Sequence, residues 1–178
     1  MACAIVNITS GESCQLGGGI INDLRIAKLS DIDLGTTALT ANVITTWAMT
    51  STNVFKKFDI DAQNSNYENV YDGSVNTQTL NIAFLNKTAA QIKALNDLKD
   101  CCKLVVALRH GRDANWRVFG LDLDIDGTTL VGSQVQGLMV TEITDNSGAA
   151  TDKLVTSMVF TGIQYNTTLF ATDEPPLT

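Results

Sequence analysis

Hydrophobic and polar residues alternate along much of this chain, which is the pattern of β-strands with one buried face. The alternation is clear over 24–29 and 75–85 and less regular over 54–61. The run 104–108 is continuously apolar, which predicts a strand that is covered on both faces. Strands are therefore the main expected element.

A hairpin and two later strands are predicted in the second half of the chain. Residues 103–122 form the predicted hairpin, around the turn 111–115. The later strands lie near 138–143 and 154–161, separated by the turn 145–148. Together with the earlier strands they predict a sheet of about six to eight strands.

One helix is predicted after residue 88. Thr88 and Gln91 have the spacing of a capping box, in which each side chain satisfies a free backbone amide at the start of a helix. Ile92, Leu95 and Leu98 then recur on one face. The expected fold class is mainly β with one α-helix.

Two segments, 30–53 and 61–74, show no clear period and are interpreted as long loops. Loops longer than about 12–15 residues are uncommon in compact domains unless they have a function. One alternative is a pair of surface loops, and the other is a pair of interaction loops ordered by a neighbouring subunit. Trp47, Tyr67 and Tyr71 are the candidate subunit contacts, because exposed aromatic residues often anchor interfaces.

Length and composition narrow the class of protein. A chain of 178 residues predicts a single domain over 1–178, with an N-terminal arm over 1–19 and a C-terminal tail over 171–178. Charged residues make up only 17%, against about 25% typically. The 44% hydrophobic content argues against a disordered chain, and the absence of a long apolar run argues against a membrane protein. A net charge of −7 argues against a basic nucleic-acid binder.

The charge is unevenly distributed. Residues 1–112 carry ten bases and ten acids, so the whole net charge of −7 comes from 113–178. Within the neutral part, 87–112 is locally basic and includes Lys93 and Lys99. In a self-assembling protein these two lysines could meet an acidic neighbour in a head-to-tail contact. The alternative is an ordinary solvated surface.

Asp122, Asp124, Asp126 and Gly127 resemble the opening of a calcium loop, which needs Asp at positions 1, 3 and 5 and Gly at position 6. Position 12 should be a bidentate Glu, but Ser133 stands there. The alternative, a strand closed by an Asp-Gly turn, is favoured. No metal site is predicted.

No motif indicates catalysis or a cofactor, so the chain is predicted not to be an enzyme. His110 is the only histidine, and the glycine run 17–19 is not followed by the Gly-Lys-Ser/Thr of a phosphate-binding loop. The start of the chain lacks the features of a signal peptide, so free thiols are expected in a reducing cytoplasm. The four cysteines are Cys3, Cys14, Cys101 and Cys102.

Three short motifs occur together and span roughly two-thirds of the chain. They are Cys3-x-Ile5 through Gly11-x-x-Cys14-x-x-Gly17-Gly18-Gly19-Ile20, the apolar strand 104–108 followed by a charged turn and Trp116-x-Val118-Phe119-Gly120-Leu121, and Phe160-Thr161-Gly162 at the end of the late strands. The combination resembles a group of tail-tube-like virion proteins of phages that infect Bacteroidetes and related bacteria. The Thr-rich stretch 36–52 has no counterpart in that pattern.

The resemblance implies a β-sandwich or half-barrel with one flanking helix, extended loops and terminal arms. Such subunits assemble into hexameric rings that stack as a tube, and each contributes strands to a continuous barrel without exposed edges. The implied partners are further copies of the chain, with other tail proteins or a sheath as possible additions. DNA would pass only as non-specific cargo, no membrane is involved, and the protein would belong to the virion tail after assembly in the host cytoplasm.

An acidic lumen would repel DNA and let it slide without sticking. The candidate lumen-facing residues are Asp122, Asp124, Asp126 and Glu142.

Two other classes remain open. A capsid decoration or head-completion protein would also be rich in strands and arms, but it would form trimers or bind only to a shell. A calcium-dependent binding module or small hydrolase would need the Asp122–Asp126 cluster to hold a metal ion. Calcium-dependent melting would identify the last class, and the shape of the oligomer would separate the first two.

Overall fold

The computed structural model of the chain describes residues 21–85, 88–101, 103–110, 115–146 and 155–177. The predicted N-terminal arm over 1–19 and most of the turn 111–115 lie outside the described residues. Within them the protein is mainly β with a single α-helix, which confirms the predicted fold class.

The strands form a longer series than the sequence predicts, because several are only three or four residues long. In chain order they are β1 (Ile21–Lys28), β2 (Ala38–Thr40), β3 (Val43–Thr46), β4 (Lys56–Phe58), β5 (Asn66–Tyr71), β6 (Asn76–Leu85), β7 (Leu104–His110), β8 (Trp116–Phe119), β9 (Leu121–Leu123), β10 (Leu130–Gly132), β11 (Gln136–Asn146), β12 (Val155–Gln164) and β13 (Leu169–Ala171). A 3-10 turn, η1 (Leu29–Asp31), follows β1, and the helix α1 (Ala89–Lys99) follows β6.

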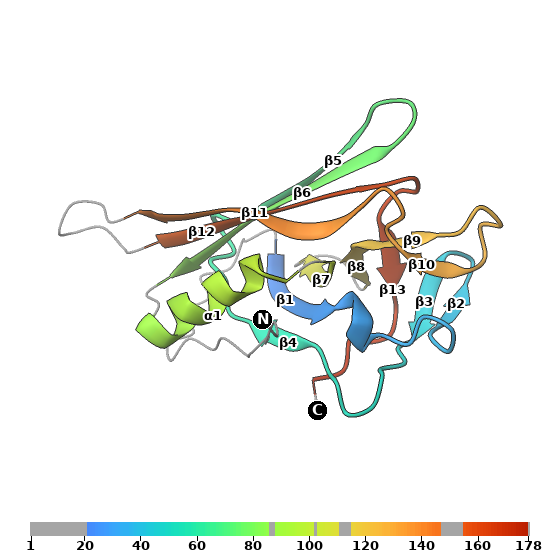
Figure 1. Cartoon of the computed structure of the whole chain (residues 1–178), viewed down its shortest axis with the longest axis horizontal. Helices are drawn as coiled ribbons and strands as arrows, with labels where there is room; N and C mark the ends of the chain where they lie inside the picture. The colour runs from blue at the N-terminus through green and yellow to red at the C-terminus, as the bar shows by residue number, and fades with distance from the viewer. Residues whose placement is uncertain (1–20, 86–87, 102, 111–114, 147–154, 178) are drawn as a thin grey trace.

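The strands make two layers that are joined at strand β7 (Figure 1). One layer has the order β2-β3-β13-β8-β7-β1-β4. The other is an antiparallel sheet of β11, β12, β6 and β5, which is called the four-stranded sheet below. It joins the first layer at one residue pair, Leu138 of β11 with Leu104 of β7. The result is a sandwich-like fold, with β9 and β10 as a separate hairpin.

The predicted hairpin over 103–122 is confirmed as β7 and β8, and β7 is covered on both faces as its apolar run indicates. Leu104, Val106 and Leu108 belong to the inner core between the two layers. Val105 and Ala107 belong to an outer core on the other face of the first layer. A strand with solvent on neither face needs apolar residues at every position.

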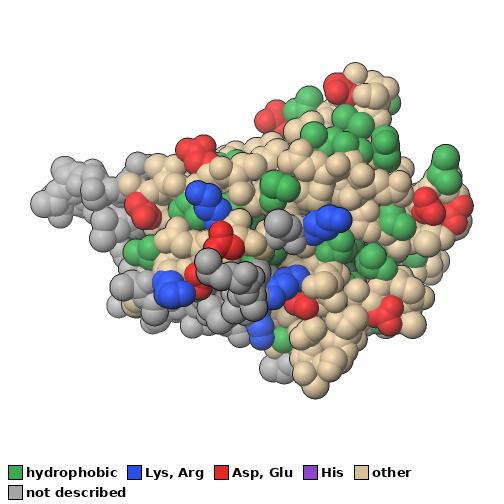
Figure 2. Space-filling view, viewed as in Figure 1, with side chains coloured by type: hydrophobic (Ala, Val, Ile, Leu, Met, Phe, Trp, Pro, Cys, Tyr) green, Lys and Arg blue, Asp and Glu red, His purple; other side chains and the backbone are tan. Residues whose placement is uncertain are grey.

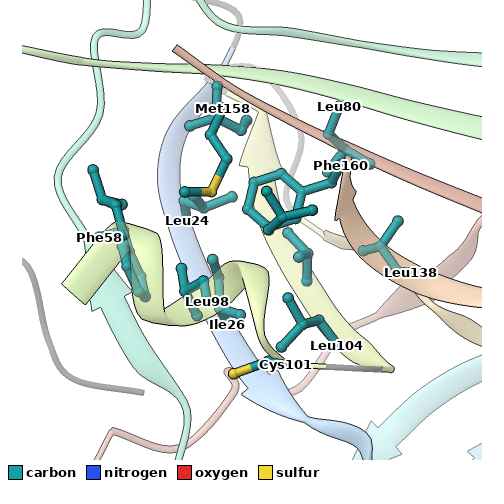
Figure 3. Packing of buried hydrophobic residues seen from close by; sticks show 14 of the residues in the cluster. Leu24, Ile26, Phe58, Leu80, Leu98, Cys101, Leu104, Leu138, Met158 and Phe160 are labelled. Carbon is teal, nitrogen blue, oxygen red and sulfur yellow. The ribbon is translucent and has the colours of Figure 1, made fainter. Parts of the chain in front are cut away.

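The inner core joins the two layers and the helix. Figure 3 shows Leu98 of α1 beside Leu24 and Ile26 of β1, with Met158 and Phe160 of β12 above them. All five side chains are fully buried, with 0% of their surface exposed. Because each buried side chain of this size contributes about 1.5–3 kcal/mol, this cluster holds the layers together.

The predicted helix start is confirmed in detail. The backbone N–H of Gln91 donates to the Thr88 hydroxyl at 3.3 Å, and the Thr88 N–H donates to the Gln91 side-chain oxygen at 2.8 Å. Leu95 and Leu98 lie in the inner core, but Ile92 is only half-buried. No helix among the described residues is long and apolar enough to span a membrane.

The prediction of long loops without regular structure is wrong for much of both segments. Strands β2 and β3 lie within 30–53, and Ile32 forms a bridge with Met49. Strand β5 lies within 61–74 and pairs with β6 along its whole length. Short strands with polar sequences carry little periodicity, so tertiary pairing decides their structure.

The C-terminal tail is packed against the body rather than free. Strand β13 pairs with β3 and β8, and Pro175 after it is buried. The N–H of Phe55 donates to the carbonyl of Pro176 at 2.9 Å, and Leu177 packs against the outer core.

Cys101 corrects the expectation of free thiols. Its side chain is 3% exposed within the inner core, and it is disulfide-bonded.

Gly120 between β8 and β9 should tolerate no side chain. Its φ is +88°, and a Cβ built there would lie 2.2 Å from the carbonyl oxygen of Leu104. We expect Gly120→Ala to lower the free energy of unfolding by about 2–3 kcal/mol, from backbone strain and the displaced carbonyl. Urea denaturation measures the change. Gly73→Ala is the matched control, since Gly73 also has positive φ but has nothing within 4 Å of the added methyl; equal losses in the two variants would contradict the close-contact explanation.

Candidate self-association surface

The four-stranded sheet has one face in the inner core and one face open. The side chains alternate between buried and half-buried along β12 and along β6 as far as Ile82. None of the outward side chains of these two strands belongs to either hydrophobic core. In Figure 1 the sheet is seen close to edge-on, with α1 and the first layer on one side and no described element on the other. This surface is called the open face below.

The four strands that form the open face are neutral or acidic in sequence. Strands β5, β6, β11 and β12 contain no Lys or Arg, and their only acids are Glu68, Glu142 and Asp145. The outward positions are mostly hydroxyl, amide and β-branched residues, such as Thr141 and Thr161, whose hydroxyl groups lie 3.1 Å apart. A surface of this composition gives a phosphate backbone no cationic contact.

Strand β5 forms one free edge of this sheet. Each residue of a strand directs its N–H and C=O to the same side, and successive residues alternate. The N–H and C=O of Ala83 both bond toward residues 61–65, on the β5 side. Thr77 and Thr79 are an even number of residues from Ala83, so their backbone groups also point toward β5. Their partners Val70 and Glu68 therefore bond to β6.

The alternate residues of β5 therefore direct their backbone groups away from β6. They are Tyr67, Asn69 and Tyr71, and no described strand pairs with β5 on that side. Such a row of free donors and acceptors is a template for pairing with another chain.

Strand β11 forms the second free edge, on the opposite side of the same sheet. Its partner on one side is β12. On its other side the only pair with a described strand is Leu138 with Leu104, so 139–146 has no described strand partner there. A register shift between Val140 and Glu142 bends this strand. Helix α1 also contacts β11. A sheet with two edges that described strands leave largely unpaired can continue into neighbouring copies on both sides.

The hairpin of β5 and β6 projects beyond the rest of the sheet at one end of the molecule (Figure 1). Asp72 fixes its turn, since its carboxylate accepts the N–H groups of Ser74 and Val75 at 3.0 Å each. These bonds hold the pKa of Asp72 below its usual value. On the adjoining strand, Val70 and Tyr71 are 49% and 65% exposed.

All the exposed large hydrophobic residues among the described residues lie at this same end. They are Val70, Tyr71, Ile125, Val135 and Tyr165. The register places the end of β5, the starts of β6 and β11 and the end of β12 together. The β9–β10 hairpin is tied to them through Ser133, whose hydroxyl donates to the carbonyls of Gln136 and Ile163. This group of five residues is called the apolar end below.

The tip of the β9–β10 hairpin presents Ile125 fully to solvent. The turn beneath it is rigid, because the Asp126 carboxylate accepts from the Thr128 N–H, the Thr129 N–H and the Thr129 hydroxyl. These bonds, with the Thr129 hydroxyl first, lower the pKa of Asp126 far below its usual value. Figure 2 shows an isolated hydrophobic side chain above acidic ones at this end of the molecule. An apolar group held in a fixed position binds with little loss of conformational entropy.

The Asp122–Asp126 segment is the end of strand β9 and the start of the hairpin turn, and not a calcium loop. Gly127 has a φ of +67° and closes the turn, with its N–H donating to the Asp124 carbonyl at 2.8 Å. Within the described residues, no three acidic, His or Cys side chains lie close enough to hold a metal ion.

The prediction that Asp122 faces a lumen is wrong. Its side chain has no exposed surface. One carboxylate oxygen accepts the Tyr165 N–H at 2.8 Å, and the other accepts the Asn166 N–H and side-chain amide at 3.1 and 2.7 Å. The sequence missed this role because a carboxylate in an alternating strand is usually on the solvent side. Its function is to fix the β12–β13 connection to β9.

The other candidate lumen residues separate. Glu142 is exposed and pairs across the sheet with Val159, which is one of the outward positions of β12, so Glu142 lies on the open face. Asp124 and Asp126 lie in the β9–β10 turn, outside the four strands that form that face. Both carboxylates accept backbone N–H groups of their own turn, which explains their positions.

The three aromatic candidates for subunit contacts also differ. Trp47 is only 8% exposed, packed edge-on against Phe55 with ring centroids 5.0 Å apart, so it is not an exposed anchor. Tyr67 is half-buried, with Phe119 5.5 Å away and the Arg117 guanidinium 5.3 Å from its ring. Only Tyr71 is available to a partner.

The two lysine candidates lie on the exposed side of α1. The Lys93 amine pairs with the Asp97 carboxylate at 2.8 Å, one turn along the same helix, so part of its charge is already neutralised. Lys99 is exposed, and within the described chain no acidic group forms an ion pair with it. Of the two, Lys99 is the better candidate for a contact with another copy.

Comparison with known proteins adds no relative: no protein-family model, no curated protein and no solved structure matches the chain.

Proposed function

We propose that this protein is a tail tube subunit of a phage virion, which self-assembles into stacked rings around a channel for DNA. The observation that carries the proposal is the four-stranded sheet, which no described strand continues beyond β5 and whose strands contain no Lys or Arg. Pairing of β5 in one copy with β11 in the next would satisfy both edges. Repetition of one head-to-tail contact closes a ring when the rotation between copies allows it.

The open face would then line the channel. DNA carries one negative charge per about 1.7 Å of helix axis, so a lining with Lys or Arg would retain it. The strands of the open face supply acids and hydroxyl groups instead. Glu142 and Glu68 are the acidic groups of that face that would repel the phosphates. The composition supports passage without binding.

The apolar end would form the contact between stacked rings. It carries Asp72, Asp124 and Asp126 beside its hydrophobic residues. Two identical acidic ends would repel each other, so the contact must be with a different surface of the next copy. Helix α1, which begins near the other end of β6 and carries Lys93 and Lys99, is the surface that we assign to it (Figure 1).

Removing the apolar side chain at the tip should separate stacking from ring formation. We expect Ile125→Ser to leave rings intact and to reduce tubes at least tenfold, because a fully exposed side chain contributes to the contact and not to the fold. Negative-stain electron microscopy counts rings and tubes. Thr52→Ala, an exposed position in the loop before β4, is the control. Tubes of normal length and number in the Ile125 variant would remove the tip from the stacking contact.

Charge reversal on α1 tests the electrostatic attraction proposed between stacked rings. Lys99→Glu should weaken assembly more at low than at high salt, since the screening length falls from about 30 Å at 0.01 M to about 10 Å at 0.1 M. Light scattering during a salt titration measures the difference from the unmodified protein. A salt-independent loss would contradict a pairing between Lys99 and an acidic neighbour, and Lys99→Gln should show the smaller effect of lost attraction alone.

A further inference from the structure

The residues after β13 dock on Arg25, Trp47 and Phe55, and the site that these residues form is called the groove below. Asp173, Glu174, Pro175 and Pro176 run across the outer face of the first layer, where Leu177 joins the outer core. Both tryptophans of the chain, Trp47 and Trp116, lie at this groove. The segment is called the C-terminal strap below.

Arg25 is the main anchor in the groove. Its side chain is 4% exposed, and its guanidinium lies 4.5 Å from the centre of the Trp116 ring. It donates to the Pro175 carbonyl and to the Glu174 carboxylate, both of the strap. Its other ion-pair partner among the described residues is Asp23 of the same strand, at 3.4 Å. A buried guanidinium needs such partners, because leaving it without them costs several kcal/mol.

Trp47 and Phe55 hold the backbone of the strap. The Trp47 indole N–H donates to the Asp173 carbonyl at 3.2 Å, and its backbone N–H donates to the Asp173 carboxylate at 3.1 Å. The Phe55 N–H donates to the Pro176 carbonyl at 2.9 Å. The groove thus recognises two carboxylates and three carbonyls at fixed spacing.

The strap is well suited to enter and leave this groove as a unit. Its two prolines fix an extended backbone, so little conformational entropy is lost on docking. Its connection to β13 is the exposed residue Thr172, and Glu174 is 65% exposed. The Arg25 hydrogen bond and charge, with smaller effects of Arg109 and Lys57, hold the pKa of Glu174 below its usual value, so the carboxylate is ionised at neutral pH.

We propose that the groove also accepts the C-terminal strap of a second copy, so that neighbouring copies exchange straps and become linked. The same contacts form in either case, and exchange of an identical element is a low-cost route to association. A fully extended strap of five residues reaches only about 17 Å, so its donor must already be in contact. In an assembly the effective concentration of the neighbouring strap is high. The proposal requires only two touching copies and does not depend on a tube.

Photo-crosslinking of the full chain tests the exchange. One population carries benzoylphenylalanine in place of Leu177, and a second, isotopically heavy population carries no probe. The two are mixed, irradiated and digested, and mass spectrometry identifies the linked peptides. We expect light–heavy links from position 177 to peptides that contain Trp47 or Phe55. Glu174→Lys in the probe chain should reduce those links at least fivefold, because it removes the Arg25 partner.

The controls separate exchange from chance contact. The probe at Thr52, an exposed position near the groove, should give no light–heavy link to Trp47, and Glu174→Gln should give an intermediate yield. If the probe reacts with the same efficiency but links only light peptides to light peptides, the strap stays in its own copy and the proposal is overturned. Links between copies that fall outside the groove, or that Glu174→Lys leaves unchanged, would also overturn it.

Discussion

Tyr71→Pro should prevent assembly without unfolding the subunit. Tyr71 lies on the free edge of β5, and its backbone N–H is directed away from β6. Proline removes that N–H and places its ring where the next strand would pair, while the β5–β6 bonds remain. We expect the concentration needed for assembly to rise at least tenfold, equivalent to about 1.4 kcal/mol or more per contact. Sedimentation at a series of protein concentrations measures it.

The side chain and the backbone of Tyr71 can be separated by a matched variant. Tyr71→Thr removes the exposed ring but keeps the edge N–H, so it should lose less than the proline variant. Circular dichroism should show the same β-sheet signal and thermal midpoint for both. If the proline variant is folded and assembles at the original concentration, β5 is not the pairing edge.

Asp122→Ala should destabilise the subunit more than any other single change among the acids. Four N–H donors, two from Asn166 and one each from Tyr165 and Leu123, bond to its fully buried carboxylate. Each donor left without a partner costs about 1–3 kcal/mol, so we expect a loss of about 3–5 kcal/mol. For a chain of this size that lowers the thermal midpoint by roughly 10 °C. Differential scanning calorimetry measures the midpoint.

Asp126→Ala is the control for Asp122→Ala, because it removes a carboxylate from the same hairpin at an exposed position. We expect a much smaller fall in the midpoint. Equal falls in the two variants would mean that the buried bonds of Asp122 do not hold the β12–β13 connection.

The sequence predicts the parts of this fold whose side chains repeat with a clear period. Strand β6, the hairpin of β7 and β8, the strands β11 and β12 and the capped helix α1 all lie where the pattern places them. In each case a local signal and the buried face agree. The capping box is specific enough that both of its hydrogen bonds are present.

Strands β1 and β4 also lie within the alternating segments 24–29 and 54–61, apart from the first residues of β1, but β2, β3, β5 and β13 could not be found from the pattern. Strand β3 pairs with β13, more than a hundred residues later, and β5 has the polar sequence of a loop. Trp47 illustrates the same limit: its burial depends on Phe55 and on the strap around Asp173. None of these contacts leaves a signal in its own segment.

The candidate surface was predictable only in part. Exposed aromatic residues and uneven charge indicated self-association, and Tyr71, Lys99 and Glu142 remain on exposed surfaces. The edge strands are determined by the order of strands in the sheet. That order cannot be inferred from any one segment of the sequence. The sequence does not predict that Arg25 and Asp122 are buried, because charged residues are usually exposed unless they are paired.

Electron microscopy of the purified, unmodified protein over a range of concentrations tests the central claim most directly. The proposed function predicts rings with a central channel that stack into tubes as the concentration rises. In their reconstruction the open face of β5, β6, β11 and β12 would line the channel. Trimers without a channel would favour a capsid decoration protein. A chain that stays monomeric up to its solubility limit, or rings with the open face turned outward, would contradict the tube.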